Sequence, residues 1–349
     1  MIDPHIIQGW RGAPRLTTFA AFFEQTARGE ANLPDLGTPQ PDFRLLDFDA
    51  DSGAFWEAHR RLWGNFDYHY FASIPYRLEE ECRLATAILK FASDASTKFD
   101  RPATLYTLGA GAGTLARTLA QLGEGRLKTL SCSPTDGNRI SFFKRRGSED
   151  AYFHHGPFFE LDDARYALDE NLAPFRNGYD VLLEDTTFQM YGKNRVDQLA
   201  VIAPRVRAGG MLVQVQKLSH PDLETYLLRE DQKDEQFKSR FFSRVQIAAK
   251  KRSVLDVMDN FQVDLESSLA ALASYFLYSA VTWNSGNFYT IASSNSLIAL
   301  WDFVSSMLRP AIPAEYCYHE LPQIFSREES LPVTADWAWR PAKSAGAAS

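Results

Sequence analysis

The fold is decided by the stretch TLYTLGAGAGTLARTLAQLG, which runs from Thr104 to Gly123. An apolar run comes first, then glycine at every second position (Gly109, Gly111 and Gly113), and then leucines at helical spacing. Glycine suits a tight strand-to-helix turn because it adopts positive φ and lets a ligand approach the backbone. The stretch therefore predicts a βα unit with a ligand site at its turn, although the same glycines could serve the turn alone.

Short apolar segments alternate with helical ones on the C-terminal side of this turn, as far as Leu218. The apolar segments are ATLYTL, LKTLSC, AYFHHG, YDVLLED and GMLVQVQ. Strands that alternate with helices form right-handed βαβ units, whose strands lie parallel in a sheet covered on both faces. We therefore predict an α/β fold with a doubly wound, mostly parallel sheet.

We expect five parts along the chain. Residues 1–98 form a mostly helical N-terminal lid or substrate region, and residues 99–218 form the doubly wound core. Residues 219–280 form a helical insertion, residues 281–340 a C-terminal part that completes the sheet, and residues 341–349 a disordered tail.

Two charged segments flank the core. SIPYRLEEECRLATAILKFAS, residues 73–93, predicts a helix with one apolar stripe on an otherwise charged surface. LLREDQKDEQFKSR, residues 227–240, predicts a solvated helix without a binding role. Further on, FLYSAVTW and NFYTIAS predict strands around a turn at 284–287, and SLIALWDFVSSML predicts an amphipathic helix.

Composition disfavours several partners. The net charge of -7 repels phosphate backbones and anionic lipid headgroups, so we expect neither nucleic acid nor a membrane as partner. Cys82, Cys132 and Cys317 show no CxxC spacing, which disfavours a disulfide framework or a zinc site. No signal peptide and no run of about 18 apolar residues is present, so we expect a cytoplasmic protein. Whether the protein forms a homodimer stays open.

The glycine spacing resembles the first motif of the class I S-adenosylmethionine-dependent methyltransferase family. A nicotinamide fingerprint would put its third glycine at position 114, which holds Thr114. Later segments follow the family's order: LKTLSCSPTDGNRI resembles its second strand, HHGPFFELD the third, GYDVLLEDTTF the fourth and RVDQLAVIAPRVRAGGMLVQVQ the fifth. The resemblance implies a Rossmann-like core that binds S-adenosyl-L-methionine and methylates oxygen or nitrogen of a small-molecule substrate.

Two other functions stay open at this point. One is transfer of the aminoalkyl arm of the same cofactor, and the other is a degenerate member that binds a ligand or partner without catalysis. The second is motivated by three positions where the family usually carries acids and this chain has Thr107, Ser131 and Pro157. A serine holds ribose hydroxyls less firmly than a carboxylate does. Asp136 could substitute, but Ser133 to Asp136 also has the pattern of a helix start.

The resemblance and the strand ends together nominate site residues. Those expected at the cofactor are Thr107, Gly109, Gly111, Gly113, Ser131, Gly156 and Glu184. Open α/β sheets bind ligands at the carboxyl ends of their strands, where this chain has His154, His155, Glu184, Asp185, Gln216 and Lys217.

Among these, Asp185, Glu184 and His155 are the predicted catalytic residues, and no metal is expected. The alternatives are that Asp185 caps the following turn TTFQMYG and that His155 caps a turn. For the acceptor we predict Tyr68, Tyr70, Tyr76 and Lys217. The tyrosines could instead pack in the core, and Lys217 could be a solvated strand end.

Overall fold

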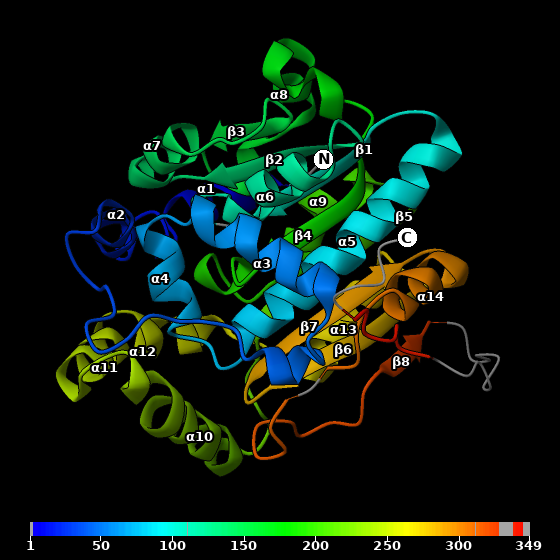
Figure 1. The fold of residues 1–349 in the computed structure, drawn as a ribbon. Helices are drawn as coiled ribbons and strands as arrows, with labels where there is room; N and C mark the ends of the chain where they lie inside the picture. The colour runs from blue at the N-terminus through cyan, green and yellow to red at the C-terminus, as the bar shows by residue number, and fades with distance from the viewer. Residues whose placement is uncertain (1–2, 110, 311, 328–337, 345–349) are drawn as a thin grey trace.

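A computed structural model describes residues 3–109, 111–310, 312–327 and 338–344. Within these residues, eight strands form a single mixed sheet in the order β3-β2-β1-β4-β5-β7-β6-β8 (Figure 1). The strands are β1 (Ala103–Leu108), β2 (Leu127–Ser133), β3 (Ala151–His155), β4 (Tyr179–Asp185), β5 (Val206–Lys217), β6 (Tyr278–Ser285), β7 (Phe288–Ser294) and β8 (Gln323–Ser326).

The first five strands run parallel, and the hairpin of β6 and β7 is added beyond β5. β7 pairs antiparallel with β5, and β6 pairs antiparallel with both β7 and β8. At the centre of the sheet, the strand register places Thr107 of β1 opposite Ser131 of β2 and Leu183 of β4. The predicted doubly wound, mostly parallel sheet is confirmed, as are the two strands around the turn at 284–287.

Helices cover both faces of the sheet (Figure 1). They are α1 (Pro4–Arg11), α2 (Ala20–Arg28), α3 (Ala50–Leu62), α4 (Asn65–Phe71), α5 (Arg77–Phe99), α6 (Thr114–Leu122), α7 (Asp136–Lys144), α8 (Asp163–Leu168), α9 (Arg195–Ile202), α10 (Leu223–Gln232), α11 (Arg244–Lys250), α12 (Asp256–Met258), α13 (Leu265–Ala273) and α14 (Leu297–Ser305). The predicted amphipathic helix in 296–308 is α14.

Strand side chains alternate between two cores because successive residues of a strand point to opposite faces. Leu105 and Val181 pack beneath α5 and α6 on one face. Tyr106 and Leu182 pack on the other face with residues of α1, α8, α9 and α13. Full burial of each such side chain stabilises the fold by about 1.5–3 kcal/mol.

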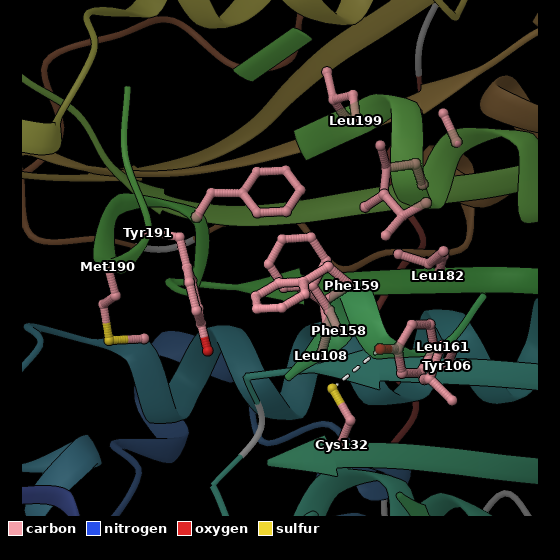
Figure 2. Close-up of a cluster of buried hydrophobic side chains, with 14 of the residues drawn as sticks. Tyr106, Leu108, Cys132, Phe158, Phe159, Leu161, Leu182, Met190, Tyr191 and Leu199 are labelled. Atoms are coloured by element: carbon pink, nitrogen blue, oxygen red, sulfur yellow. Dashed lines mark hydrogen bonds between the residues drawn. The ribbon is translucent and has the colours of Figure 1, made fainter. Parts of the chain in front are cut away.

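The second core reaches the loops that follow β3 and β4. Figure 2 shows Phe158 and Phe159 gathered against Tyr191, and Phe158 lies 5.5 Å from the ring of Phe188. In the same cluster the hydroxyl of Tyr106 donates to the sulfur of Cys132 at 3.0 Å. These contacts fix the carboxyl edge of the sheet, where ligands of open α/β sheets bind.

The two charged segments differ from their predictions. In the first two turns of α5 the charged positions are buried as well as the apolar stripe, and Arg77 and Glu81 form an ion pair at 2.6 Å. The solvated helix predicted for 227–240 is wrong, because Arg229, Glu230 and Lys238 are buried. Charged side chains tolerate such burial only when they are paired, and long-range pairing cannot be seen in a local pattern.

Two remaining expectations concern the ends of the chain and the membrane. Lys343 of the predicted tail lies 2.7 Å from Asp51, and residues 345–349 lie outside the described residues. Among the residues that are described, no helix combines the length and apolar character needed to cross a bilayer.

Candidate functional site

The turn between β1 and α6 accepts only glycine at three positions. Gly109, Gly111 and Gly113 have φ of 78°, 54° and 66°, which an L-side chain rarely adopts. Space excludes a side chain too. A Cβ on Gly109 would overlap the hydroxyl of Thr187, one on Gly111 would overlap the ring of Phe66, and one on Gly113 would lie 2.6 Å from Ser131 Oγ.

Three small cavities meet at this turn, and Gly109 and Phe66 line all of them. The Asn138 cavity, beside β2, has about 20 Å³ of free space and is also lined by Arg15, Gly111, Ser133 and Pro157. The acidic cavity, beside α5, has about 20 Å³ and contains Asp67, Glu81 and Asp185. The lysine cavity, beneath α10–α12, has about 100 Å³ and contains Lys217, Lys233, Lys238 and Lys250.

Asn138 leaves one hydrogen-bonding atom free at the first cavity. Its Nδ2 donates to Ser133 Oγ at 3.2 Å, while its buried Oδ1 has no partner in the part of the chain that the structure describes. A buried acceptor without a partner is costly, and an N–H or O–H of a ligand would remove that cost. Asn138 is therefore a candidate binding residue that the sequence patterns did not identify.

Thr107 and Ser131 satisfy each other beneath the turn. Their hydroxyl oxygens lie 2.9 Å apart, both side chains are buried, and neither lines a cavity. Asp136 is the first residue of α7 and pairs with Arg139 at 2.7 Å, so a helix starts here as predicted, but its N-cap is Thr135 and the cap makes no side-chain hydrogen bond. Of the predicted cofactor set, the structure therefore brings Gly109 and Gly111 to the cavities. Gly113, Thr107 and Ser131 line none of the three.

The residues at the end of β3, His154 to Gly156, line none of the three cavities. His155 is exposed, and the N–H of Gly156 donates to the carbonyl of Ser133 at 3.1 Å. His154 is buried, and its loss of hydration lowers its pKa to about 4. The predicted catalytic role of His155 and the cofactor role of Gly156 stay predictions.

Asp185 is held from two helices in the acidic cavity. The hydroxyl of Tyr70 in α4 donates to its Oδ1, and Arg77 in α5 donates to its Oδ2 at 2.9 Å. Arg77 also pairs with Glu81, where burial raises the pKa of the carboxyl to about 7. Asp67 accepts the N–H of Gly64 at 2.7 Å. Glu81 and Asp185 thus share the guanidinium of Arg77, and Asp67 lines the same cavity. Carboxylates at one cavity attract a cationic ligand.

The residue after Asp185 is strained. Thr186 has φ of 50°, and a β-branched residue in that region is a true outlier. Such conformations persist where the surrounding structure enforces them, and they concentrate at ligand sites. Thr186 lines the lysine cavity beside Gly109.

Glu184 faces the opposite side of β4 and caps the next turn. Its Oε1 accepts the N–H groups of Thr187 at 2.7 Å and Phe188 at 3.0 Å, and its Oε2 accepts from Gln216. Burial raises its pKa to about 7. Glu184 thus makes the turn contacts that the alternative interpretation assigned to Asp185, and lines none of the three cavities. Its catalytic and cofactor roles stay predictions.

The predicted acceptor residues separate into two groups. Tyr70 lines both the acidic and the lysine cavities, and Lys217 lines the lysine cavity. Tyr68 packs edge-on against Trp63 at 5.0 Å, and Tyr76 packs on Tyr316 at 5.2 Å, both away from the cavities. Lys217 is buried 2.8 Å from Glu230, so the alternative of a solvated strand end is wrong.

The chain matches no protein-family model and no curated protein. It is similar to an O-methyltransferase family protein from Burkholderia thailandensis (17% identity, TM-score 0.38), with 61% of this chain and 57% of that chain covered. It thus spans less than two thirds of that protein.

Two solved structures that contain S-adenosylhomocysteine (SAH) are covered almost completely. The plantazolicin methyltransferase BpumL in complex with SAH shares 11% identity at a TM-score of 0.44, with 72% of this chain and 98% of that chain covered. Magnesium protoporphyrin IX methyltransferase from Synechocystis PCC 6803 with bound SAH shares 10% identity at a TM-score of 0.38, with the same coverage. The likeness to these class I methyltransferases is one of fold.

Proposed function

We propose that this chain binds S-adenosylmethionine at the glycine turn and methylates oxygen or nitrogen of a small molecule. One observation carries the proposal. The turn that accepts only glycine at three positions lies at the carboxyl edge of a doubly wound sheet. On one side of it is the amide oxygen of Asn138, which has no partner among the described residues, and on the other is a cavity with three carboxyl groups. Such edges are where open α/β sheets bind ligands.

The residues present fit the chemistry of this cofactor. Asn138 Oδ1 would accept a hydrogen bond from the N–H or O–H groups of an adenosine. Asp67, Glu81 and Asp185 would attract the ammonium and the sulfonium. When bound, S-adenosylmethionine supplies a methyl group on a positively charged sulfur.

Entry requires a side chain to move. The ring of Phe66 lies against Gly111 and stacks on Phe23 at 5.8 Å. The Asn138 cavity and the acidic cavity each have room for about one water molecule. Phe66 must turn away from Gly111 for a nucleoside to reach Asn138. We therefore expect binding to reorder α4, which carries Phe66.

The pair of Tyr70 and Asp185 would take the proton that the acceptor loses. Tyr70 Oη would accept it from the acceptor while the phenol's own proton moves to Asp185 Oδ1, along the existing hydrogen bond. The acceptor's electron pair would then form the bond to the methyl carbon, while the bond from that carbon to sulfur breaks and its electrons stay on the sulfur of S-adenosylhomocysteine. Arg77 holds Asp185 in place for this step.

The coproduct tests the proposal. The purified chain is titrated calorimetrically with S-adenosylmethionine and then incubated with it and a pool of small-molecule acceptors, and the coproduct is identified by mass spectrometry. Methyl transfer yields S-adenosylhomocysteine, whereas aminoalkyl transfer yields methylthioadenosine. Well-folded protein that binds no S-adenosylmethionine would overturn the assignment and favour a degenerate, non-catalytic protein.

A further inference from the structure

We propose that the lysine cavity binds the anionic group of the acceptor, so that the substrate is a small molecule with a carboxylate or phosphate on an apolar body. That the bound anion is the methyl acceptor rests on the proposed function, whereas the anion site itself rests on the residues of the lysine cavity. Its four lysines come from β5, from the π-helical turn Lys233–Phe237, from the segment after it and from α11.

The acids that pair with these lysines leave positive charge at the cavity. Lys217 lies 2.8 Å from Glu230 and 3.2 Å from Asp259, and Lys238 lies 2.7 Å from Asp234. Lys233 also pairs with Glu230 and with Asp234, so each of these two acids pairs with two lysines. Among the described residues that line the cavity, the four lysines are present and these three carboxylates are not. The lysine side chains thus form part of the cavity wall and the carboxylates lie outside it, with Lys238 Nζ buried beside Asp234.

Lys250 is the fourth ammonium, and it is bound only by neutral groups. Its Nζ lies 2.6 Å from His69 Nε2 and 2.9 Å from Ser73 Oγ, and no carboxylate in the described part of the chain is within ion-pair distance of it. His69 Nδ1 donates to the carbonyl of Asn32 at 2.5 Å, which makes Nε2 the acceptor for Lys250. An ammonium has three donors, so one remains for a ligand.

Mutual repulsion within the cluster makes an anion favourable there. Burial and the neighbouring ammonium groups lower the pKa of Lys250 well below its usual value, and they lower that of Lys238 to about 7. A carboxylate or phosphate among the four Nζ atoms would oppose both effects and would favour the charged lysines. Charge-assisted hydrogen bonds of this kind are about twice as strong as neutral ones.

The rest of the cavity limits the body of the ligand. Phe22, Phe66, Phe288, Met190 and Met258 supply apolar walls. The free space of about 100 Å³ is smaller than the roughly 150 Å³ cavity that accommodates benzene. The cavity therefore takes the anionic group with part of a ring, and a whole ring needs the side chain of Phe66 to turn away. Tyr70 lines the same cavity and bonds Asp185, so an acceptor anchored on the lysines lies beside the proposed proton-accepting pair.

Matched ligands test the inference without cofactor. Benzoate, its neutral isostere benzamide, and inorganic phosphate are each titrated calorimetrically into the full chain. We expect the preferred anion to bind at least about tenfold more tightly than benzamide, because the charged hydrogen bonds are lost with the amide. The tighter of benzoate and phosphate identifies the class of anion.

Two lysine variants supply the comparison. Lys250→Met should bring the ratio of the affinity for the anion to that for benzamide close to one. Lys238→Met should reduce this preference for the anion. Lys251→Met should leave it unchanged, since Lys251 follows Lys250 in sequence but does not line the cavity. Equal binding of anions and benzamide, no binding of either anion, or an unchanged preference in folded Lys250→Met would overturn the inference.

The two proposals fail separately. An anion site in a chain that binds no S-adenosylmethionine would refute the methyltransferase assignment and keep the anion site. S-adenosylmethionine binding without the anion preference would refute the anion site and keep the methyltransferase assignment.

Discussion

The hydroxyl of Tyr70 donates a hydrogen bond to Asp185, although 115 positions separate the two residues in the chain. The second oxygen of Asp185 is held by Arg77 at 2.9 Å. Both contacts come from the N-terminal helices, which therefore complete a site whose glycines and acid belong to the sheet. Tyr70 is the member of the pair that lines both the acidic and the lysine cavities.

Removing this hydroxyl should impair turnover more than folding. We expect Tyr70→Phe to lower kcat about 10²-fold, because the acceptor loses the group that takes its proton. Asp185 keeps Arg77, so the free energy of unfolding should fall by only about 1–3 kcal/mol for the unsatisfied oxygen. Coproduct formation, once an acceptor is known, and chemical denaturation measure the two effects.

Tyr68 supplies the control for Tyr70. It lies in the same helix, packs against Trp63 and lines none of the three cavities. Tyr68→Phe should therefore leave kcat unchanged. Equal rates for the two phenylalanine variants would remove Tyr70 from the proton-accepting pair.

The glycine turn can be tested against a glycine elsewhere. Gly111→Ala places a methyl group against the ring of Phe66 at φ of 54°, and we expect S-adenosylmethionine affinity to fall at least tenfold. Gly125 has φ of 82°, and its added Cβ would meet nothing within 4 Å. Gly125→Ala should cost about 1–2 kcal/mol of stability and keep the affinity. The same affinity in both variants would contradict a ligand site at the turn.

The core was predictable because its signals are local. Apolar runs of strand length, alternating with helical spacing and separated by glycine, specify the elements from Ala103 to Lys217 with no knowledge of distant contacts. Adjacent acids at a strand end are less informative. They point to opposite faces, and only the register of β4 determines that Asp185 faces α5 and Glu184 the turn.

The lysine cavity and the buried ions of α5 could not be predicted in the same way. Charged residues are mostly exposed, so a run such as 227–240 favours a solvated helix on its own. What buries Lys233 and Lys238 there is pairing with acids of the same segment beneath α11, whose Lys250 contacts His69 of α4. Asn138 gave no signal because its unpaired oxygen exists only in the fold.

Restoring the family's acid at position 131 should harm the protein. Ser131 is buried, with its Oγ 2.9 Å from Thr107 and close beneath Gly113. A carboxylate there would be both larger and charged without a cation, so we expect Ser131→Asp to lower the free energy of unfolding by several kcal/mol. Ser131→Ala, which removes only a hydroxyl, should cost about 1 kcal/mol. A stable aspartate variant with tighter S-adenosylmethionine binding would show that position 131 reaches the ligand.

The contribution of Lys238 to stability should rise with pH above neutrality. Its pKa falls to about 7 through burial and the nearby Lys233, while the unfolded chain holds that proton to about pH 10.4. Lys217, Lys250 and His69 also line this cavity, with Asp234 behind. Between these pH values the unfolded state binds more protons, so unfolding becomes harder by up to about 1.4 kcal/mol per pH unit.

Urea denaturation of wild type and Lys238→Met between pH 7 and 9 measures this contribution. The methionine variant cannot titrate and should lose that part of the rise. Cys132, whose pKa is raised to about 11, opposes the trend only above about pH 9. Identical slopes for the two proteins would mean that Lys238 keeps its proton in the folded state.

Glu184 should behave as a turn cap that costs stability when it is charged. Its Oε1 accepts the N–H groups of Thr187 and Phe188, and Gln216 donates to its Oε2. Its pKa of about 7 lies above that of the unfolded chain, so the contribution of Glu184 to stability is greatest below about pH 4.5 and falls by up to about 3 kcal/mol as pH rises through 7.

In Glu184→Gln the amide oxygen keeps the cap. The new N–H groups can reach the oxygens of Gln214 and Gln216, which have no partner among the described residues, once those amides flip. We therefore expect the glutamine variant to match or exceed wild-type stability at pH 8. Glu184→Ala should lose about 1–3 kcal/mol, because it leaves the two buried N–H groups without an acceptor. Thermal melts at pH 5 and pH 8 measure this, and a glutamine variant as unstable as the alanine variant would show that the ionised carboxylate is required.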